Sequence, residues 1–383
     1  MYNCFFKKFH IGAYCLGKNC RDEEHITELR KCGIDLLFGI DRDTALLDLL
    51  SKHGIGAVVN GVLPGWFGAN GKNAGTMHLT NPIEAYIERA AKFVDHPAIL
   101  GIDVGDEPSM LDFPHYGRVI EAMKAEFPNK LLYLNLYPSY GMLASAGTEQ
   151  AQRELGTDTY TEYLTAYTEN VDLPYLSIDH YPYSSNLSTF LLDLKNASDE
   201  AKMHGKELMT VLQVNSHVPD VFISTEQLRF QAWCALAYGS RSVAWACYSP
   251  GWWHNCVLDK NGAKTEQYEK LKTVNAELRR LADKYMTYTH VKTEICKSGK
   301  SHVDELGVKI DAECELLTGQ FLDKNGSPAL LCVPLDSGKR LFVSQSDSPK
   351  KRIYIHKPDE TVALDEQNDS VCHLGEPIFI YNE

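Results

Sequence analysis

Acidic residues gather in one stretch of the chain, residues 100–109, which reads Leu-Gly-Ile-Asp-Val-Gly-Asp-Glu-Pro-Ser. The carboxyl groups are those of Asp103, Asp106 and Glu107. Like charges close together raise the pKa of a carboxyl group, so one group can hold a proton while another is ionised, as general acid and base catalysis requires. A solvated acidic loop or a helix cap would have the same composition. The place of the stretch in the fold therefore decides between these interpretations.

An apolar run ends directly before these acids. Residues 98–104 are hydrophobic apart from Gly101 and Asp103, a pattern typical of a parallel strand that is covered on both faces. Pro108 cannot donate to a strand ladder, so the strand must end near it. A glutamate at the C-terminal tip of a parallel strand lies where α/β barrels carry their active sites. Glu107 is therefore the predicted catalytic acid.

Short β-like runs alternate with amphipathic helical runs along the first three quarters of the chain. The predicted strands are His10–Cys15, Ile34–Ile40, Ile55–Asn60, Ile99–Val104, Leu131–Leu136, Tyr175–Ile178, Leu208–Val214 and Ser242–Cys247. The predicted helices are Asp22–Cys32, Thr44–Lys52, Pro82–Val94, Tyr116–Glu126, Tyr160–Val171, Leu187–His204, Glu226–Tyr238 and Lys264–Tyr285. Eight such units predict a (β/α)₈ TIM barrel over residues 1–286. The alternative, a doubly wound open sheet, usually carries a glycine-rich phosphate loop, and none follows the first strand.

The pattern changes after Met286. Short strands are predicted at residues 310–317, 330–333, 341–344, 352–356 and 377–381, and turns begin at Phe321, Asp336 and Lys357. Residues 287–383 are therefore predicted to form a small C-terminal all-β sandwich domain.

Polar and aromatic residues follow the C-terminal tips of the predicted barrel strands. Carboxyl groups can supply acid and base, aromatic rings can stack on sugar rings, and amides can bond hydroxyl groups, so the mixture suits a polyhydroxylated ligand. The predicted second catalytic carboxylate is Asp179, after the sixth strand. The predicted substrate-binding residues are Tyr14, Asn60, Trp66, Asp103, Asp106, Asn135, Tyr137, His180, Tyr181, Gln213, Asn215, Tyr248, Trp252 and Trp253. Each aromatic residue taken alone could instead be ordinary core packing.

Composition excludes several classes of partner. The net charge of −13 argues against nucleic acid and against an anionic membrane surface. The first residues contain no run that resembles a signal peptide, and no later segment is apolar enough to span a bilayer. The 11 cysteines are scattered without zinc-type spacing, which favours a reducing, cytoplasmic setting. No cofactor is predicted, and the oligomeric state is left open.

Other kinds of catalysis find less support in the sequence. Metal-dependent barrels usually gather several histidines at their strand ends, and here only His180 and His217 qualify. A serine hydrolase would need a Gly-x-Ser-x-Gly elbow, which is lacking. A metal-dependent hydrolase or lyase is kept as a third class, which loss of activity on chelation would indicate.

Three segments resemble the clan A glycoside hydrolases, and most closely their β-galactosidase-like bacterial members. They are Gly105-Asp-Glu-Pro108, residues 176–183 (Leu-Ser-Ile-Asp-His-Tyr-Pro-Tyr) and residues 228–239 (Leu-Arg-Phe-Gln-Ala-Trp-Cys-Ala-Leu-Ala-Tyr-Gly). The clan carries Asn-Glu-Pro after the fourth strand, and its glutamate is the general acid/base. The resemblance therefore implies this role for Glu107, with Asp106 in place of the usual asparagine.

The seventh strand departs from the clan pattern. The clan has its nucleophilic glutamate at the end of this strand, where the present chain has Gln213 or Asn215. An amide cannot form a glycosyl ester. The prediction is therefore a glycosidase that uses Glu107 and Asp179. A carboxylate spacing that admits a water would make the enzyme inverting, and the choice between inversion and retention is left open. The alternative is a sugar-binding barrel that has lost its chemistry.

Overall fold

The computed structural model describes residues 2–65, 67, 71–140, 154–303, 306–345, 352–364 and 370–382. The chain divides into two compact units. Residues 1–223 and 241–272 form the first unit, and residues 224–240 and 273–383 form the second.

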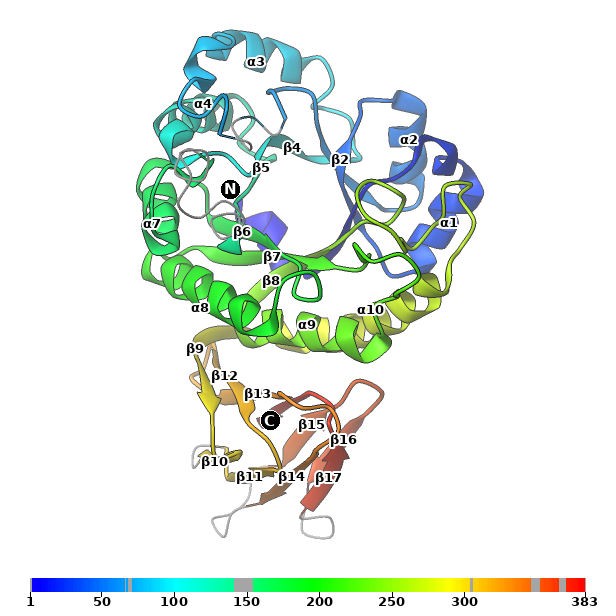
Figure 1. The fold of residues 1–383 in the computed structure, drawn as a ribbon, viewed down its shortest axis with the longest axis vertical. Helices are drawn as coiled ribbons and strands as arrows, with labels where there is room; N and C mark the ends of the chain where they lie inside the picture. Colours follow the sequence, from blue (N-terminus) through cyan, green and yellow to red (C-terminus); the bar gives the residue numbers. More distant parts are fainter. Residues whose placement is uncertain are drawn as a thin grey trace. The chain divides into compact units, whose positions relative to one another are not determined.

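Eight parallel strands of the described residues form one barrel sheet, as predicted (Figure 1). The strands are β1 (His10–Tyr14), β2 (Leu36–Ile40), β3 (Gly56–Val59), β4 (Ile99–Asp106), β5 (Leu131–Asn135), β6 (Tyr175–His180), β7 (Glu207–Gln213) and β8 (Ser240–Ala246). Their order is β5-β4-β3-β2-β1-β8-β7-β6. The barrel closes between β5 and β6, where the Leu136 N–H donates to the Ser177 carbonyl at 2.9 Å.

Strand β4 is longer than predicted. It continues past Val104 to Asp106, because Gly105 and Asp106 still pair with Leu134 and Asn135 of β5. This extension fixes the backbone of Asp106 beside that of Asn135, at the C-terminal end of the barrel.

Helices separate the strands along the chain. They are α1 (Glu23–Lys31), α2 (Thr44–Lys52), α3 (Ile83–Ala91), α4 (Phe113–Glu126), α7 (Tyr160–Asn170), α8 (Leu187–Met203), α9 (Thr225–Ala237) and α10 (Glu266–Tyr285). Short 3₁₀ helices span Tyr2–Lys7, Lys18–Cys20, Met77–Leu79 and Met110–Asp112. Figure 1 shows α1, α2, α3, α4, α7 and α8 around the strands.

Local sequence explains where these helices begin and end. The Asp22 side chain caps α1 by accepting from the His25 N–H at 3.0 Å, and Gly33 follows the helix at a φ of 84°. Helix α4 begins at Phe113, before the predicted Tyr116, because Pro114 in its first turn needs no hydrogen-bond acceptor.

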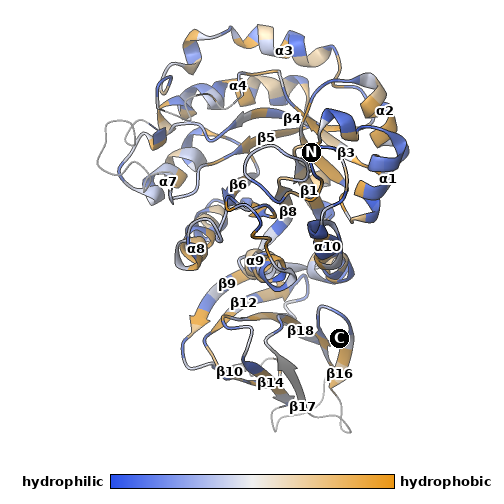
Figure 2. Cartoon of the chain, turned by 45° about the vertical axis from the view of Figure 1, so that its right-hand side comes forward, coloured by the Kyte–Doolittle hydropathy of each residue, from blue (hydrophilic) through white to orange (hydrophobic). Residues whose placement is uncertain are grey.

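Helices α1 and α8 are amphipathic rather than apolar throughout. Figure 2 shows hydrophilic and hydrophobic residues side by side on α1 and α8. Among the described residues, no helix is long and apolar enough to cross a membrane.

The second unit contains two antiparallel sheets. Its strands are β9 (Tyr288–Cys296), β10 (Lys300–Val303), β11 (Val308–Ala312), β12 (Leu316–Asp323), β13 (Pro328–Pro334), β14 (Arg340–Gln345), β15 (Ile353–His356), β16 (Thr361–Leu364), β17 (Ser370–Leu374) and β18 (Ile378–Asn382). The four-stranded sheet has the order β10-β11-β14-β17, and the six-stranded sheet has the order β16-β15-β18-β13-β12-β9.

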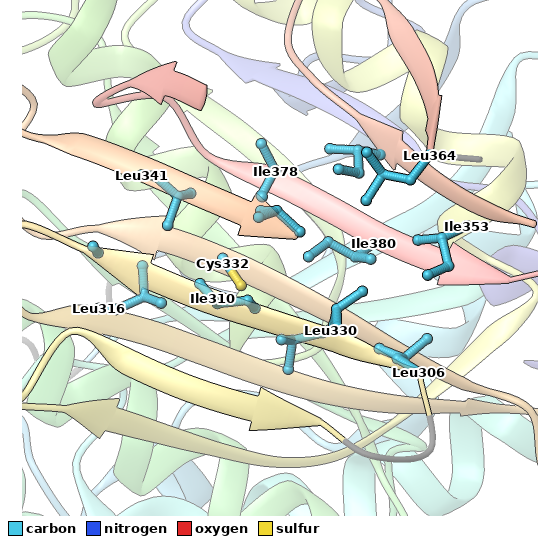
Figure 3. Close-up of a cluster of buried hydrophobic side chains, with 14 residues drawn as sticks. Leu306, Ile310, Leu316, Leu330, Cys332, Leu341, Ile353, Leu364, Ile378 and Ile380 are labelled. Carbon is cyan, nitrogen blue, oxygen red and sulfur yellow. The ribbon is translucent and has the colours of Figure 1, made fainter. Parts of the chain in front are cut away.

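Side chains from both sheets meet in one buried cluster, which confirms the predicted C-terminal β domain (Figure 3). Ile310 and Leu341 come from the four-stranded sheet, whereas Leu330, Ile353 and Ile380 come from the six-stranded sheet. The alternating burial of β11 is typical of a strand with one face on a core and one in solvent.

One strand prediction for this domain was wrong, and one predicted turn begins too early. Residues 310–317 form the end of β11 and the start of β12, separated by residues 313–315. The predicted turn at Phe321 lies within β12, which continues to Asp323 because its residues still pair with β9 and β13.

Helix α9 belongs to the second unit. It packs against β12 and β13, and Gly319 permits the close approach, since a Cβ there would lie 2.3 Å from the Ala237 carbonyl oxygen. A domain boundary between residues 286 and 287 stays a prediction.

Candidate active site

A cavity of about 490 Å³ lies at the C-terminal ends of the barrel strands. The described side chains that line it are Tyr14, Asp106, Glu107, Asn135, Tyr140, Asp179, Tyr181, Trp252 and Trp253. They come from β1, β4, β5 and β6 and from the segments after β4, β5, β6 and β8. Of the residues predicted for the site, the cavity thus brings together both catalytic candidates and six of the substrate-binding candidates.

A chain of hydrogen bonds fixes the floor of this cavity. The Tyr14 hydroxyl donates to the Tyr133 hydroxyl at 2.6 Å, and the Tyr133 hydroxyl lies 3.1 Å from Ser177 Oγ. The Ser177 hydroxyl donates to Asn135 Oδ1 at 2.9 Å. Because the side-chain oxygen Oδ1 of Asn135 accepts from Ser177, the side-chain nitrogen Nδ2 points in the opposite direction, toward the carboxyl groups.

The Asn135 amide nitrogen binds two carboxyl groups. Nδ2 donates to Asp179 Oδ1 at 2.8 Å and to Asp106 Oδ1 at 3.2 Å. The Asp179 side chain is almost fully buried, and the Tyr181 hydroxyl also donates to it. One amide group therefore determines the positions of two acids that come from different strands.

These acids have unusual proton affinities. Burial, and then the negative charge of Asp106, raise the pKa of Asp179 to about 7, against the hydrogen bond from Asn135. Burial likewise raises the pKa of Asp106 to about 6. Deeper in β4, burial and then the Asp106 charge raise the pKa of Asp103 to about 8. No lysine or arginine is among the described residues that line the cavity, so no cation there compensates these charges.

Glu107 has a strained backbone. Its φ is 46°, in the left-handed region that few non-glycine residues adopt, and its N–H donates to the Asn135 carbonyl oxygen at 2.9 Å. The chain turns sharply here between β4 and Pro108, and the Glu107 side chain lines the cavity. Strain of this kind is concentrated at functional sites.

Aromatic rings form one wall. Trp252 and Trp253 are 38% and 37% exposed, and their ring centroids lie 6.4 and 5.2 Å from that of Tyr181. Asn215 holds this segment by donating from Nδ2 to the Trp252 carbonyl oxygen at 2.6 Å. The wall offers flat apolar faces beside the carboxyl groups.

Several predicted site residues lie behind the lining. His180 is fully buried between Asp193 Oδ2, at 2.8 Å, and Ser185 Oγ, at 2.9 Å. Gln213 accepts from the Tyr183 N–H and donates to Ser184 Oγ, both at 2.8 Å. These side chains position the segments after β6 and β7.

Others are not among the described residues that line the cavity. Asn60 is exposed and donates to the Gly39 carbonyl oxygen at 3.0 Å. Tyr248, two residues after the end of β8, is buried near Cys32 and Tyr268. Tyr137 is buried with its ring 6.4 Å from that of Tyr163. Asp103 lies below the lining, and Trp66 lies outside the described residues.

The sequence analysis missed Tyr140, which lines the cavity after β5. It also missed Tyr133 and Ser177, which lie inside the barrel and connect Tyr14 to Asn135. Their polar groups were the available signal, because hydroxyl groups in buried strands need partners within the barrel.

The described side chains of the cavity do not form a metal centre. Within the described residues, no group of three or more His, Cys, Asp or Glu side chains could hold a metal ion.

The (β/α)₈ barrel followed by a β domain is a fold that this chain shares with glycoside hydrolases of known structure. A GH42 β-galactosidase from G. stearothermophilus superposes with a TM-score of 0.61 at 7% identity, over 98% of each chain. A protein described as a glycoside hydrolase also gives 0.61, at 11% identity, over 98% of this chain and 92% of its own. A GH51 arabinofuranosidase from Xanthomonas axonopodis pv. citri gives 0.50 at 10% identity, over 99% and 96%.

These identities show a shared fold alone. No protein-family model matches the sequence, and the comparison with curated proteins found no match. The activity must therefore be argued from the site.

Proposed function

We propose that this chain hydrolyses O-glycosidic bonds, with Glu107 as the general acid and Asp179 as the second carboxylate. The observation that carries the proposal is the cavity itself, in which both carboxyl groups and an aromatic wall line one space at the strand ends. The substrate class is a small neutral glycoside or oligosaccharide. An anionic sugar would meet three carboxyl groups and no cation among the described lining residues.

The chemistry follows from the two carboxyl groups. Protonated Glu107 gives its proton to the leaving glycosidic oxygen, while ionised Asp179 takes a proton from the water that attacks the anomeric carbon. The glycosidic C–O bond breaks and a new C–O bond to water forms, so the anomeric configuration is inverted. Trp252 and Trp253 stack on the sugar, and the Tyr14 hydroxyl contacts its hydroxyl groups.

The position of Gln213 favours a second candidate, a sugar-binding barrel without catalysis. Its amide bonds the segment after β6, so β7 contributes no carboxyl group to the cavity from this position. The two candidates differ in turnover, not in binding.

A panel of aryl glycosides of both anomeric forms tests the proposal, together with calorimetric titration of the corresponding free sugars. We expect release of the aryl alcohol from at least one neutral glycoside, without loss of activity on chelation. Sugar binding without turnover across the panel would favour the second candidate. The cytoplasmic location stays a prediction from the cysteine content.

A further inference from the structure

We propose that Asp106 and Asp179 share one proton across the Asn135 amide, and that this pair, rather than Asp179 alone, is the base that activates water. The inference rests on the proposed function and extends it to a residue that had been assigned only to substrate binding. Asp106 then acts through Asp179, as a positioning residue that sets when the base is ionised.

The geometry brings the two carboxyl groups close together. Both Oδ1 atoms lie within hydrogen-bond distance of Asn135 Nδ2, at 3.2 Å for Asp106 and 2.8 Å for Asp179. The distance between the two Oδ1 atoms is therefore at most the sum of these values. That limit is smaller than the roughly 6.5–9.5 Å that separates the acid and base of inverting enzymes, so Asp106 and Asp179 are too close to be the acid and base of an inverting pair.

The Asn135 amide cannot turn away from this role. Its Oδ1 accepts from Ser177 Oγ, and Ser177 is itself linked to Tyr133 and Tyr14. Turning the amide over would place its oxygen against two carboxyl groups and lose these bonds. Both amide hydrogens are thus directed at the acids.

The surroundings contain no compensating cation among the described residues. The described titratable groups that interact with the pair come from six elements and the segments after them. They are Asp103 and Glu107 on or after β4, Tyr116 on α4, Tyr14 and Cys15 at the end of β1, Tyr133, Tyr137 and Tyr140 on or after β5, Tyr160 and Tyr163 on α7, and Tyr181 after β6. The tyrosines stay neutral near pH 7 because burial raises their pKa values. Two ionised carboxylates in such a place repel each other, so one of the pair stays protonated.

Proton affinity agrees with this arrangement. The pKa is raised to about 6 for Asp106 and to about 7 for Asp179, mainly by burial, and the Asp106 charge contributes to the latter. Because the two carboxyl groups interact, they bind and release protons as a pair. At neutral pH the pair carries about one proton and one negative charge.

The reaction then balances as follows. Glu107 gives its proton to the leaving oxygen as the glycosidic bond breaks. The attacking water forms the new bond to the anomeric carbon and gives a proton to the pair, which becomes neutral. One proton then returns from the pair to Glu107 through solvent, and the site is restored without any other reactant.

Substitution of Asp106 distinguishes a base formed by the Asp106–Asp179 pair from a base formed by Asp179 alone. Asp106→Asn removes the like charge and lowers the pKa of Asp179. The acid-side limb of the pH–rate profile should therefore move to lower pH by roughly one unit. Asp179→Asn should abolish turnover at every pH. Asp199→Asn is the control, because Asp199 is an exposed aspartate of α8 that pairs with Lys195 at 2.6 Å outside the cavity, and it should leave this limb in place.

The proton itself can be measured without turnover. In protein labelled with ¹³C at the aspartate carboxyl groups, NMR titration of the wild type should show two coupled transitions near neutral pH, and Asp106→Asn should leave one transition, moved to lower pH. Thermal unfolding verifies that each variant is folded. An Asp179 transition that does not move in Asp106→Asn would overturn the shared proton. Coupled transitions in a protein that hydrolyses no glycoside would instead overturn the role as base and the proposed function, while the shared proton would stand.

Discussion

Single side chains in the cavity are held by partners on neighbouring strands. Asn135 is fixed by Ser177, and Asp179 is fixed by Asn135 and Tyr181. Such preorganised groups lose little freedom when a ligand binds, and their charges act in a site with little water.

The aromatic wall gives a prediction at this scale. Trp252→Ala or Trp253→Ala should weaken sugar binding by about 1–3 kcal/mol, because each indole offers a large apolar face to the cavity. Isothermal titration with the best sugar of the panel measures the effect. Phe342→Ala is the control, since Phe342 is an equally exposed ring (38%) on β14. A large fall in melting temperature with unchanged affinity would show that the tryptophans belong to the scaffold.

The sequence predicted which residues lie at the strand ends, but not which of their side chains reach the cavity and which bind neighbouring segments. The sequence placed Asp106, Glu107 and Asp179 at the cavity, because the C-terminal ends of the barrel strands converge there and these acids stand at those ends. His180 could not, because its partner Asp193 lies on α8 and the pairing depends on tertiary packing. Gln213 does not line the cavity for the same reason, because its side-chain amide binds the segment after β6 and this tertiary contact cannot be read from the sequence.

At the scale of elements, glycines determine how closely the barrel strands approach. Gly101 of β4 lies against β5, and a Cβ at this position would be 2.6 Å from the Leu131 carbonyl oxygen. A backbone atom cannot move aside as a flexible side chain can.

Gly101→Ala should therefore lower the free energy of unfolding by about 1–3 kcal/mol, the usual cost of overpacking. Urea denaturation measures the change. The matched control is Gly65→Ala, because nothing lies within 4 Å of a Cβ there. Equal stability of the two variants would contradict the account of the β4–β5 contact.

The order of the elements was well predicted, since the βα alternation is regular and glycines follow many helices. The β domain was predicted less well. Its strands are short and lie close together, and the segment 310–317 is apolar at both ends, so hydrophobicity alone did not reveal the break at residues 313–315.

At the scale of the whole molecule, the buried acids make stability depend on pH. The pKa of Asp103 is raised from 3.8 to about 8. Between these values the folded protein keeps a proton that the unfolded chain has released. The contribution of this group to the free energy of unfolding therefore falls as the pH rises through that interval.

Asp103→Asn should remove this fall in the free energy of unfolding with rising pH, because the amide does not ionise. The variant should match the wild type near pH 4 and be more stable by about 1–2 kcal/mol at pH 8, allowing for the partial exposure of Asp103. Its Oδ1 can still accept from the Gly105 N–H, as Asp103 does at 3.0 Å. Denaturant unfolding at both pH values decides the question, and a difference that does not change with pH would contradict the assignment.

Glu28 provides a comparison of opposite sign. Hydrogen bonds from Lys264, Lys31 and Tyr268 lower its pKa from 4.5 to about 2. The stabilisation is present above pH 4.5 and is lost as the pH falls toward 2. Glu28→Gln should therefore be less stable than the wild type at pH 7, with a difference that shrinks in acid. The same measurement on both variants separates the two effects.

The central claim is that carboxyl groups of this cavity carry out glycoside hydrolysis. Its most direct test is the turnover of an aryl glycoside by Glu107→Gln, measured beside the wild type and a variant outside the cavity such as Phe342→Ala. We expect Glu107→Gln to lose turnover while its melting temperature and sugar affinity stay close to those of the wild type, because the amide cannot give a proton to the leaving oxygen. Undiminished turnover by this variant would remove Glu107 from the mechanism and contradict the account.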